Sequence, residues 1–170
     1  MVNEGRLVNE KRRALVNDIY ERYTTEIENS FVNTTICENN DLRSKRVTGT
    51  KQTDIVFEHM DSVSAVMKYA GEDTAILNFA NYETPGGDFL YGAMAQEEAL
   101  CLESTLYPVI SNHEFYYKEN RQSLNYVGVL YSNRALWSPG IVFFRDGKEK
   151  YCDVITCAAP NASAYLSAGG

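Results

Sequence analysis

One stretch of the sequence, residues 78–98, combines residue types that ligand binding and proton transfer require. The apolar run over 75–80 predicts a buried strand, and the asparagines Asn78 and Asn81 mark its end. A Pro-Gly-Gly loop follows at 85–87, and Gln96, Glu97 and Glu98 then open a predicted helix. Ligand sites in α/β sheets lie just beyond the carboxyl ends of strands, where glycines let the backbone approach a ligand closely. Together these features predict a binding or catalytic site.

Each feature also has a purely structural explanation. The asparagines could close a turn, and Gly86 and Gly87 could supply positive φ angles in an ordinary turn. The two acids could simply favour the helix dipole, by about 0.3–1 kcal/mol each. These alternatives stay open for each feature alone, and it is their occurrence together at one strand end that favours function.

The two adjacent acids also restrict the mechanism. Neighbouring helix positions point about 100° apart, so Glu97 and Glu98 cannot face each other across one bond. We therefore expect them to divide the work. One orients the substrate, and the other transfers a proton with a pKa raised by burial and by its neighbour's charge.

The composition bounds the class of protein. A chain of 170 residues with 44% hydrophobic and 23% charged residues predicts one globular domain. Residues 1–50 carry eight basic and eight acidic residues, so the net charge of −7 comes from residues 51–170. This excludes a basic field, and we expect no direct nucleic-acid binding.

The sequence also argues against membranes and metals. No apolar run reaches the roughly 18 residues of a membrane span, and the N-terminus lacks the apolar stretch of a signal peptide. We therefore expect a cytoplasmic protein with no membrane partner. The four cysteines form no Cys-x-x-Cys pair and the chain has two histidines, so a structural zinc site is not expected.

Hydrophobic periodicity predicts an α/β or mixed α+β layered domain. It places a long helix over Glu4–Asn29, an irregular stretch over Ser30–Thr53, and a loop over Tyr82–Met94. Shorter helices are expected near 61–69 and 95–106, strands at 55–57, 75–80, 126–131, 141–144 and 154–158, and turns at 138–140 and 146–147.

The signature residues resemble a known family. Pro85-Gly86-Gly87, a seven-residue spacer after Asp88 and then Gln96-Glu97-Glu98 resemble the loop of microbial-type poly(ADP-ribose) glycohydrolases, within the macrodomain superfamily. That loop has three glycines, a short spacer and Gln-Glu-Glu. Residues 77–81, 99–107, 131–132, 138–139, 142–146 and 154–161 are similar as well, so the resemblance covers most of residues 10–161.

The resemblance implies a macrodomain-like three-layer α/β/α fold with a mixed sheet. Residues 1–170 would form a single catalytic domain with a helical N-terminal extension over about 4–50 and the signature loop at 78–98. The implied reaction is cleavage of the ribose–ribose O-glycosidic bonds of poly(ADP-ribose). Glu98 would be the general acid and then the base, and Glu97 would hold the hydroxyls of the terminal ribose.

The remaining implied site residues bind substrate. Asn81 would contact the distal ribose, and the N–H groups of Gly86 and Gly87 would bind the diphosphate, with Asp88 and Gln96 beside them. The partner would be ADP-ribose or poly(ADP-ribose) on modified proteins, with no metal or cofactor. The sequence does not decide between polymer and a single attached ADP-ribose as the substrate.

Two departures from the family pattern carry expectations. Asp88 replaces the third glycine, and a carboxylate at 4 Å from a phosphate charge is repulsive by about 1 kcal/mol in water. The family also continues beyond the block ending at Asn161, so we expect the C-terminal part of the fold to be missing.

The alternative function is therefore an ADP-ribose-binding macrodomain module with little or no turnover. We also expect an open sheet edge at 154–158, weak ADP-ribose affinity, and either oligomers or a second chain that completes the sheet.

Overall fold

The computed structural model describes residues 4–38, 52–122, 133–160 and 166–167. Two helices open the chain, α1 (Glu4–Arg22) and α2 (Thr24–Asn33), where the periodicity predicts one. They are separated at Tyr23, whose ring stacks on Phe144 at 5.7 Å and whose hydroxyl donates to Glu149 Oε1 at 2.6 Å. These contacts with the sheet turn the chain, so α2 can pack along a different direction.

Four strands form one mixed sheet in the order β1-β3-β4-β2. β1 (Thr35–Glu38) and β4 (Lys148–Cys157) both pair antiparallel with β3 (Arg134–Arg145), whereas β2 (Ala75–Phe79) pairs parallel with β4. The predicted turn at 146–147 joins β3 to β4, with positive φ at Asp146 and Gly147. Because β2 runs parallel to β4, the two strands end side by side, with Phe79 opposite Cys157.

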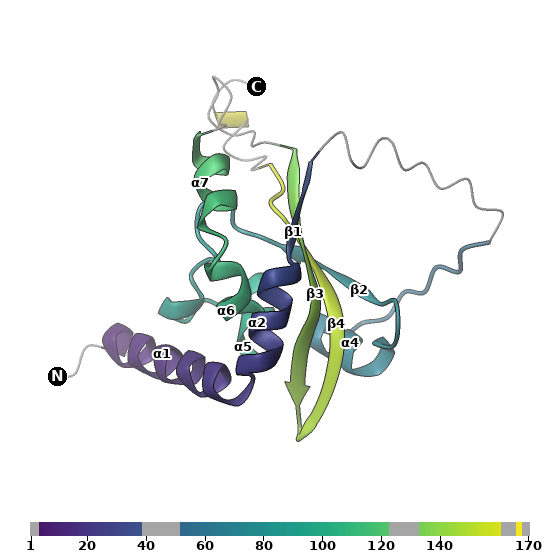
Figure 1. Ribbon diagram of the computed structural model, residues 1–170, viewed down its shortest axis with the longest axis horizontal. Helices are drawn as coiled ribbons and strands as arrows, with labels where there is room; N and C mark the ends of the chain where they lie inside the picture. The colour runs from purple at the N-terminus through teal and green to yellow at the C-terminus, as the bar shows by residue number, and fades with distance from the viewer. Residues whose placement is uncertain (1–3, 39–51, 123–132, 161–165, 168–170) are drawn as a thin grey trace.

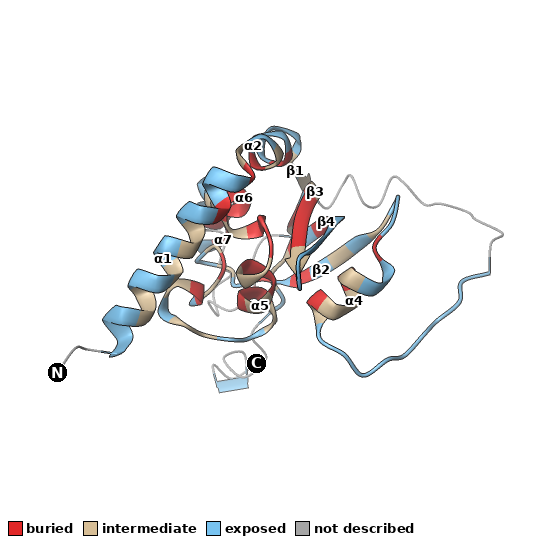
Figure 2. Cartoon of the chain, turned by 90° about the horizontal axis from the view of Figure 1, so that it is seen from below, coloured by how far each residue is buried: buried red, intermediate tan, exposed pale blue. Residues whose placement is uncertain are grey.

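Helices lie on both sides of the sheet, but part of one face stays exposed along Leu77, Ile155 and Trp137. Figure 1 shows α4 (Ser62–Tyr69) on one side and the other helices on the opposite side. Those others include α1, α2, the 3₁₀ helix η1 (Phe89–Tyr91), α5 (Gln96–Leu102), α6 (Leu106–Ser111) and α7 (Glu114–Gln122). The three-layer α/β/α prediction with a mixed sheet is confirmed, and Figure 2 shows the buried residues gathered between these layers.

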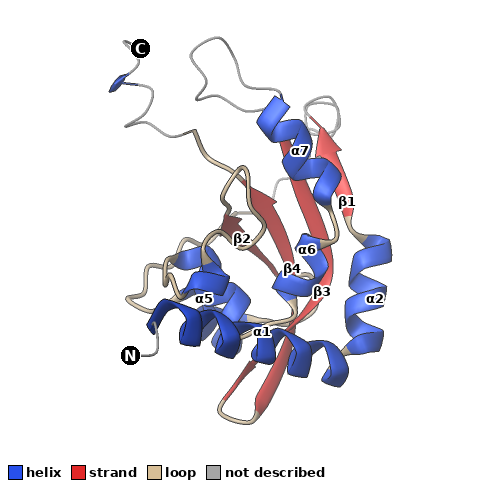
Figure 3. Ribbon diagram, turned by 90° about the vertical axis from the view of Figure 1, so that its left-hand side faces the viewer, coloured by secondary structure: helices blue, strands red, loops and turns tan. Residues whose placement is uncertain are grey.

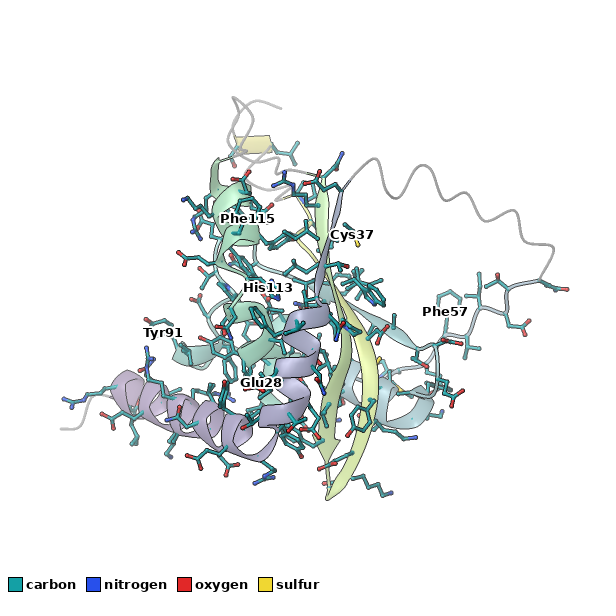
Figure 4. All side chains as sticks on the ribbon, in the orientation of Figure 1. Glu28, Cys37, Phe57, Tyr91, His113 and Phe115 are labelled. Atoms are coloured by element: carbon teal, nitrogen blue, oxygen red, sulfur yellow. The ribbon has the colours of Figure 1, made fainter. Side chains whose placement is uncertain are left out.

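Two predicted elements are wrong. Residues 55–57 form no strand, and the Phe57 side chain is 92% exposed on an extended segment (Figure 4). An apolar run becomes a strand only where its backbone can pair, and no described strand lies beside it. The predicted turn at 138–140 lies inside β3, as a bulge with φ of +66° at Gly140. Proline is tolerated at such a bulge because the ladder is already interrupted there.

Tertiary contacts end the predicted helix 95–106 early, at Leu102 in α5, and the next helix, α6, which was not predicted, begins at Leu106. Between them, Thr105 N–H donates to the Val142 carbonyl at 2.9 Å, and Phe144 N–H donates to the Glu103 carbonyl at 2.9 Å. β3 therefore captures the chain and interrupts the helix. The stretch 30–53, predicted to be irregular, contains β1. The helix α7 was not predicted. The predicted strand 126–131 lies outside the described residues.

The remaining predicted elements are confirmed with changes. The helix near 61–69 is α4, and Asp61 caps it by accepting a hydrogen bond from Ser64 N–H at 2.9 Å. The strand at 75–80 is β2, but it is an edge of the described sheet, with Leu77 and Phe79 exposed. The segment 154–157 is the end of β4 and pairs on both sides, so the expected open edge there is wrong.

Among the described residues, no helix is long and apolar enough to cross a membrane.

Candidate functional site

The signature loop leaves the end of β2 and returns to the sheet at α5, with α1 packed beside it (Figure 3). Asn81 starts the loop by accepting hydrogen bonds on Oδ1 from Glu83 N–H at 2.8 Å and Thr84 N–H at 3.0 Å. This arrangement is an Asx turn, so the structural role considered for Asn81 is present. It also fixes the side chain at the start of the loop, and its amide nitrogen makes no hydrogen bond to the residues that the structure describes.

Both loop glycines are required by their surroundings. Gly86 and Gly87 have φ angles of +69° and +56°, which glycine adopts without steric cost. A Cβ at Gly87 would lie 2.5 Å from Glu98 Oε1, and a Cβ at Gly86 would lie 2.7 Å from a ring carbon of Tyr107. The absence of side chains therefore lets the loop lie directly against Glu98 and Tyr107.

Glu97 is buried and accepts hydrogen bonds from three donors. Its Oε2 accepts from Asn81 N–H at 2.7 Å, and its Oε1 accepts from Gly86 N–H at 3.1 Å and from Asn78 Nδ2 at 3.3 Å. Burial raises the pKa of Glu97 to about 7, against the opposing effect of these donors. This one carboxyl ties the end of β2 to the glycine loop.

Glu98 is buried as well, but its surroundings are poorer in donors. Its Oε1 accepts from Asp88 N–H at 3.1 Å, whereas its Oε2 is buried and has no partner among the described residues. A buried carboxyl oxygen without a hydrogen bond is costly, and native proteins retain such groups where function uses them. Glu98 thus keeps one carboxyl oxygen free of hydrogen bonds to the described residues.

Gln96 attaches α5 to the edge of β2. Its Oε1 accepts from Phe79 N–H at 2.9 Å, while its Nε2 donates to the Leu77 carbonyl at 2.8 Å and lies 3.3 Å from Ser62 Oγ. The side-chain amide thus pairs with the N–H and C=O groups on the free edge of β2, which a neighbouring strand would otherwise bond. The contacts seen here position the acids.

Asp88 occupies the third glycine position of the signature without strain. Its φ and ψ are −94° and 28°, which any L-residue can adopt. Its N–H holds Glu98, and no cation lies within ion-pairing distance of its carboxylate among the described residues.

The loop N–H groups expected to bind a diphosphate have protein partners in this structure. Gly86 N–H donates to Glu97, and Gly87 N–H donates to the Thr84 carbonyl at 3.0 Å. A diphosphate bound there would therefore exchange with bonds that the loop already makes.

Cys101 and Tyr107 lie outside the predicted site but contribute to it, and Asn78, predicted only to mark the strand end, contributes as well. Asn78 is fully buried and bonds Glu97, and its Oδ1 has no partner in the described structure. Cys101 and Tyr107 pack behind Gly86, and burial followed by the charges of Glu97 and Glu98 raises the pKa of the Cys101 thiol. Cys101 is three and four positions after the acids, so helical spacing could have placed it on their face.

In the part of the chain that the structure describes, neither a metal-ligand cluster nor the cavity beside α2 adds a residue to this site. Within the described ranges, no group of three or more His, Cys, Asp or Glu residues is placed to hold a metal ion. A cavity of about 620 Å³ between α2 and the strands β3 and β4 contains none of the predicted site residues.

Comparison with known proteins gives the family. The family model described as microbial-type PARG, catalytic domain, matches residues 1–146. A crystal structure of poly(ADP-ribose) glycohydrolase (PARG) from Thermomonospora curvata is similar at 27% identity, with a TM-score of 0.73 over 91% of this chain and 66% of that chain. The same enzyme bound to the inhibitor ADP-HPD gives 27% identity and a TM-score of 0.72, over 91% of this chain and 65% of that chain.

A third similar structure is PARG from Deinococcus radiodurans in complex with ADP-ribose, at 31% identity and a TM-score of 0.72, over 83% of this chain and 60% of that chain. The chain thus spans less than two thirds of the length of these solved proteins. No curated protein matches the sequence. Because the family model matches 146 of the 170 residues, the chain belongs to the microbial-type poly(ADP-ribose) glycohydrolase family.

Proposed function

We propose that this chain carries the catalytic carboxyls of a glycohydrolase that cleaves the ribose–ribose O-glycosidic bonds of poly(ADP-ribose). Family membership supports the reaction class, and the relatives crystallised with ADP-ribose and with ADP-HPD support the ligand. The observation that carries the assignment of roles is the buried Oε2 of Glu98, which has no partner among the described residues, beside Glu97, both of whose oxygens accept hydrogen bonds.

In the proposed mechanism, Glu98 acts as acid and then as base. Its protonated carboxyl gives the proton to the glycosidic oxygen that leaves as the ribose–ribose bond breaks. The resulting carboxylate accepts a proton from the attacking water, which restores the acid and completes the hydrolysis. The bond from Asp88 N–H to Oε1 holds the group so that Oε2 is the oxygen presented to substrate.

The other site residues bind and position. Glu97 holds the loop and uses its remaining lone pair for the hydroxyls of the terminal ribose. The free amide nitrogen of Asn81 reaches the distal ribose. Gln96 acts by fixing the start of α5 on β2.

For the diphosphate, we propose Gly86 and Gly87 with the adjoining Asp88 backbone. Turning Gly87 N–H from the Thr84 carbonyl to a phosphate gives up one neutral hydrogen bond, a net of about 0.5–1.5 kcal/mol, for a bond to a charged acceptor. The exchange is therefore favourable in principle, because bonds to charged acceptors are the stronger ones.

A second candidate function is an ADP-ribose-binding module without turnover. The carboxylate of Asp88, in the position of the third signature glycine and without a cation partner, favours this alternative because it would repel a diphosphate.

One pair of measurements separates the two functions. Release of ADP-ribose from poly(ADP-ribose) by the purified chain is measured beside a calorimetric titration with ADP-ribose. Release together with binding supports the hydrolase, whereas binding without release establishes the module. Absence of both would contradict both proposals.

We further propose that one face of the sheet associates with a second polypeptide or a second copy of the chain. Trp137, Ile155 and Leu77 are aligned across three strands, and Phe79 follows on the same face, with all four side chains exposed. Exposed apolar rows of this kind mark association surfaces. Light scattering on the isolated chain tests the second copy, and a monomer at high concentration would contradict self-association and leave a second polypeptide as the occupant.

A further inference from the structure

Two arginines of α1 lie against the signature loop. The guanidinium of Arg12 sits over the Phe89 ring, 5.1 Å from its centroid, and its Nη2 is 3.4 Å from Met94 Sδ. Arg13 donates from Nε to Asn9 Oδ1 at 2.9 Å, and Asn9 in turn donates to the Leu90 carbonyl at 3.0 Å. Both positive charges are thus held next to η1.

This region is continuous with the two acids. Tyr107 packs on the backbone of Gly86, whose N–H bonds Glu97, and its ring also lies 5.1 Å from the Phe89 ring. On its other side, Tyr107 shares the wall of a cavity of about 200 Å³ with Arg13 and Asn17. Tyr107 therefore connects the surroundings of Glu97 with those of Arg13 through direct contacts.

The charges of these two arginines are not neutralised. Neither Arg12 nor Arg13 has a carboxylate within ion-pairing distance among the described residues. By contrast, Arg6 and Arg22 on the same helix pair with Glu10 and Asp18, each at 2.9 Å. In a chain of net charge −7, an unpaired basic pair beside the site is a local field of opposite sign, which attracts anions.

An exposed aromatic ring accompanies these charges. Tyr91 ends η1 and is 70% exposed, and Figure 4 shows it on the loop beside α1. Cations that track phosphates and rings on which bases stack are the two elements of single-stranded nucleotide binding. Poly(ADP-ribose) repeats both of the groups that these elements recognise, a diphosphate and an adenine.

We propose that Arg12, Arg13 and Tyr91 form an outer subsite for the ADP-ribose unit adjoining the one held at Glu98. The arginines bind the diphosphate of that unit, and the Tyr91 ring stacks on its adenine. This inference rests on the proposed function, and it assigns the chain a preference for polymer over a single ADP-ribose.

The test compares polymer with monomer. Affinities for poly(ADP-ribose) of defined length and for ADP-ribose are measured in the Glu98→Gln background, so that polymer is not consumed. Arg12→Gln/Arg13→Gln should lower polymer affinity about tenfold or more and leave ADP-ribose affinity within about twofold. Loss of two phosphate contacts should also reduce the slope of log affinity against log salt by about 1.4.

Two further variants control for charge and folding. Arg6→Gln/Arg22→Gln removes the same charge from α1 and should leave polymer affinity unchanged. Arg12→Lys/Arg13→Lys keeps the charge and should restore most of the polymer affinity. Tyr91→Ala should weaken polymer binding without changing the salt slope.

Several outcomes would overturn the subsite. These are unchanged polymer affinity, equal losses for polymer and monomer, equal losses in the Arg6/Arg22 control, or an equal loss for single-stranded DNA of the same charge. The proposed hydrolase fails separately. Polymer binding that depends on Arg12 and Arg13 without release of ADP-ribose by the parent chain would leave the subsite standing and contradict the enzyme.

Discussion

Glu97 and Glu98 are neighbours in the sequence, yet they lie in two differently built regions of the site. Glu97 faces the end of β2, where three donors from Asn78, Asn81 and Gly86 hold it. Glu98 faces the glycine loop, where one donor from Asp88 holds one oxygen and the other has no protein partner. The two buried carboxyls therefore differ in the number of their donors rather than in burial, and the proposed division of roles rests on this difference.

The largest expected difference between the two regions is in stability. Glu97→Ala leaves three donors without an acceptor, two of them from the buried residues Asn78 and Gly86, and should lower the free energy of unfolding by about 2–4 kcal/mol. Glu98→Ala orphans only one N–H and should cost about 1 kcal/mol. Urea denaturation of both variants measures the contrast, and equal losses would mean that Glu97 does not hold the loop.

The pH dependence sharpens the same contrast. The pKa of Glu97 is about 7 in the fold against 4.5 for the free group, so the folded state binds this proton more tightly. Its contribution is fully present below pH 4.5 and is lost as pH rises to about 7, by up to about 3 kcal/mol.

Unfolding free energies at pH 5 and pH 8 measure this contribution when the parent is compared with Glu97→Gln, which cannot titrate. The parent's advantage over the variant should be greater at pH 5. A pH-independent difference between the two would refute the raised pKa.

The smallest expected effect lies on the loop side, at Asp88. Asp88→Asn removes the charge and keeps the shape, and it should tighten ADP-ribose binding by about 1 kcal/mol at low salt and by less at high salt. Calorimetry at two ionic strengths gives both values. Affinity unchanged at both would show that the carboxylate does not act on the ligand.

Local sequence was enough to predict the parts of the site that depend on local geometry. The strand end, the glycine loop and the two acids are encoded by spacing, and Asp61 caps α4 as its residue type predicts. The prediction that Glu97 and Glu98 point apart follows from the helix alone. The structure adds which partners each acid finds, because those partners come from the loop and from β2.

What could not be predicted depends on contacts distant in sequence. α7 buries the adjacent pair Tyr116 and Tyr117, which does not have helical spacing, so no periodic apolar pattern marks it. The break at Tyr23 needs Phe144 and Glu149, and the division of α5 from α6 needs β3. The strand 75–80 was predicted to be buried but is an edge, and 154–158 was predicted to be an open edge but pairs on both sides. The order of strands in a sheet depends on such distant contacts, so local sequence does not predict it.

The division of roles between the two acids is tested most directly by Glu98→Gln, with hydrolysis of poly(ADP-ribose) and binding of ADP-ribose measured on the same preparation. The variant keeps the shape of the side chain but cannot shuttle a proton. The account predicts a rate lower by about 10²–10⁴, with unchanged affinity and melting temperature. A variant that turns over polymer within about threefold of the parent would contradict the account, because Glu98 would then not be the proton-transfer group.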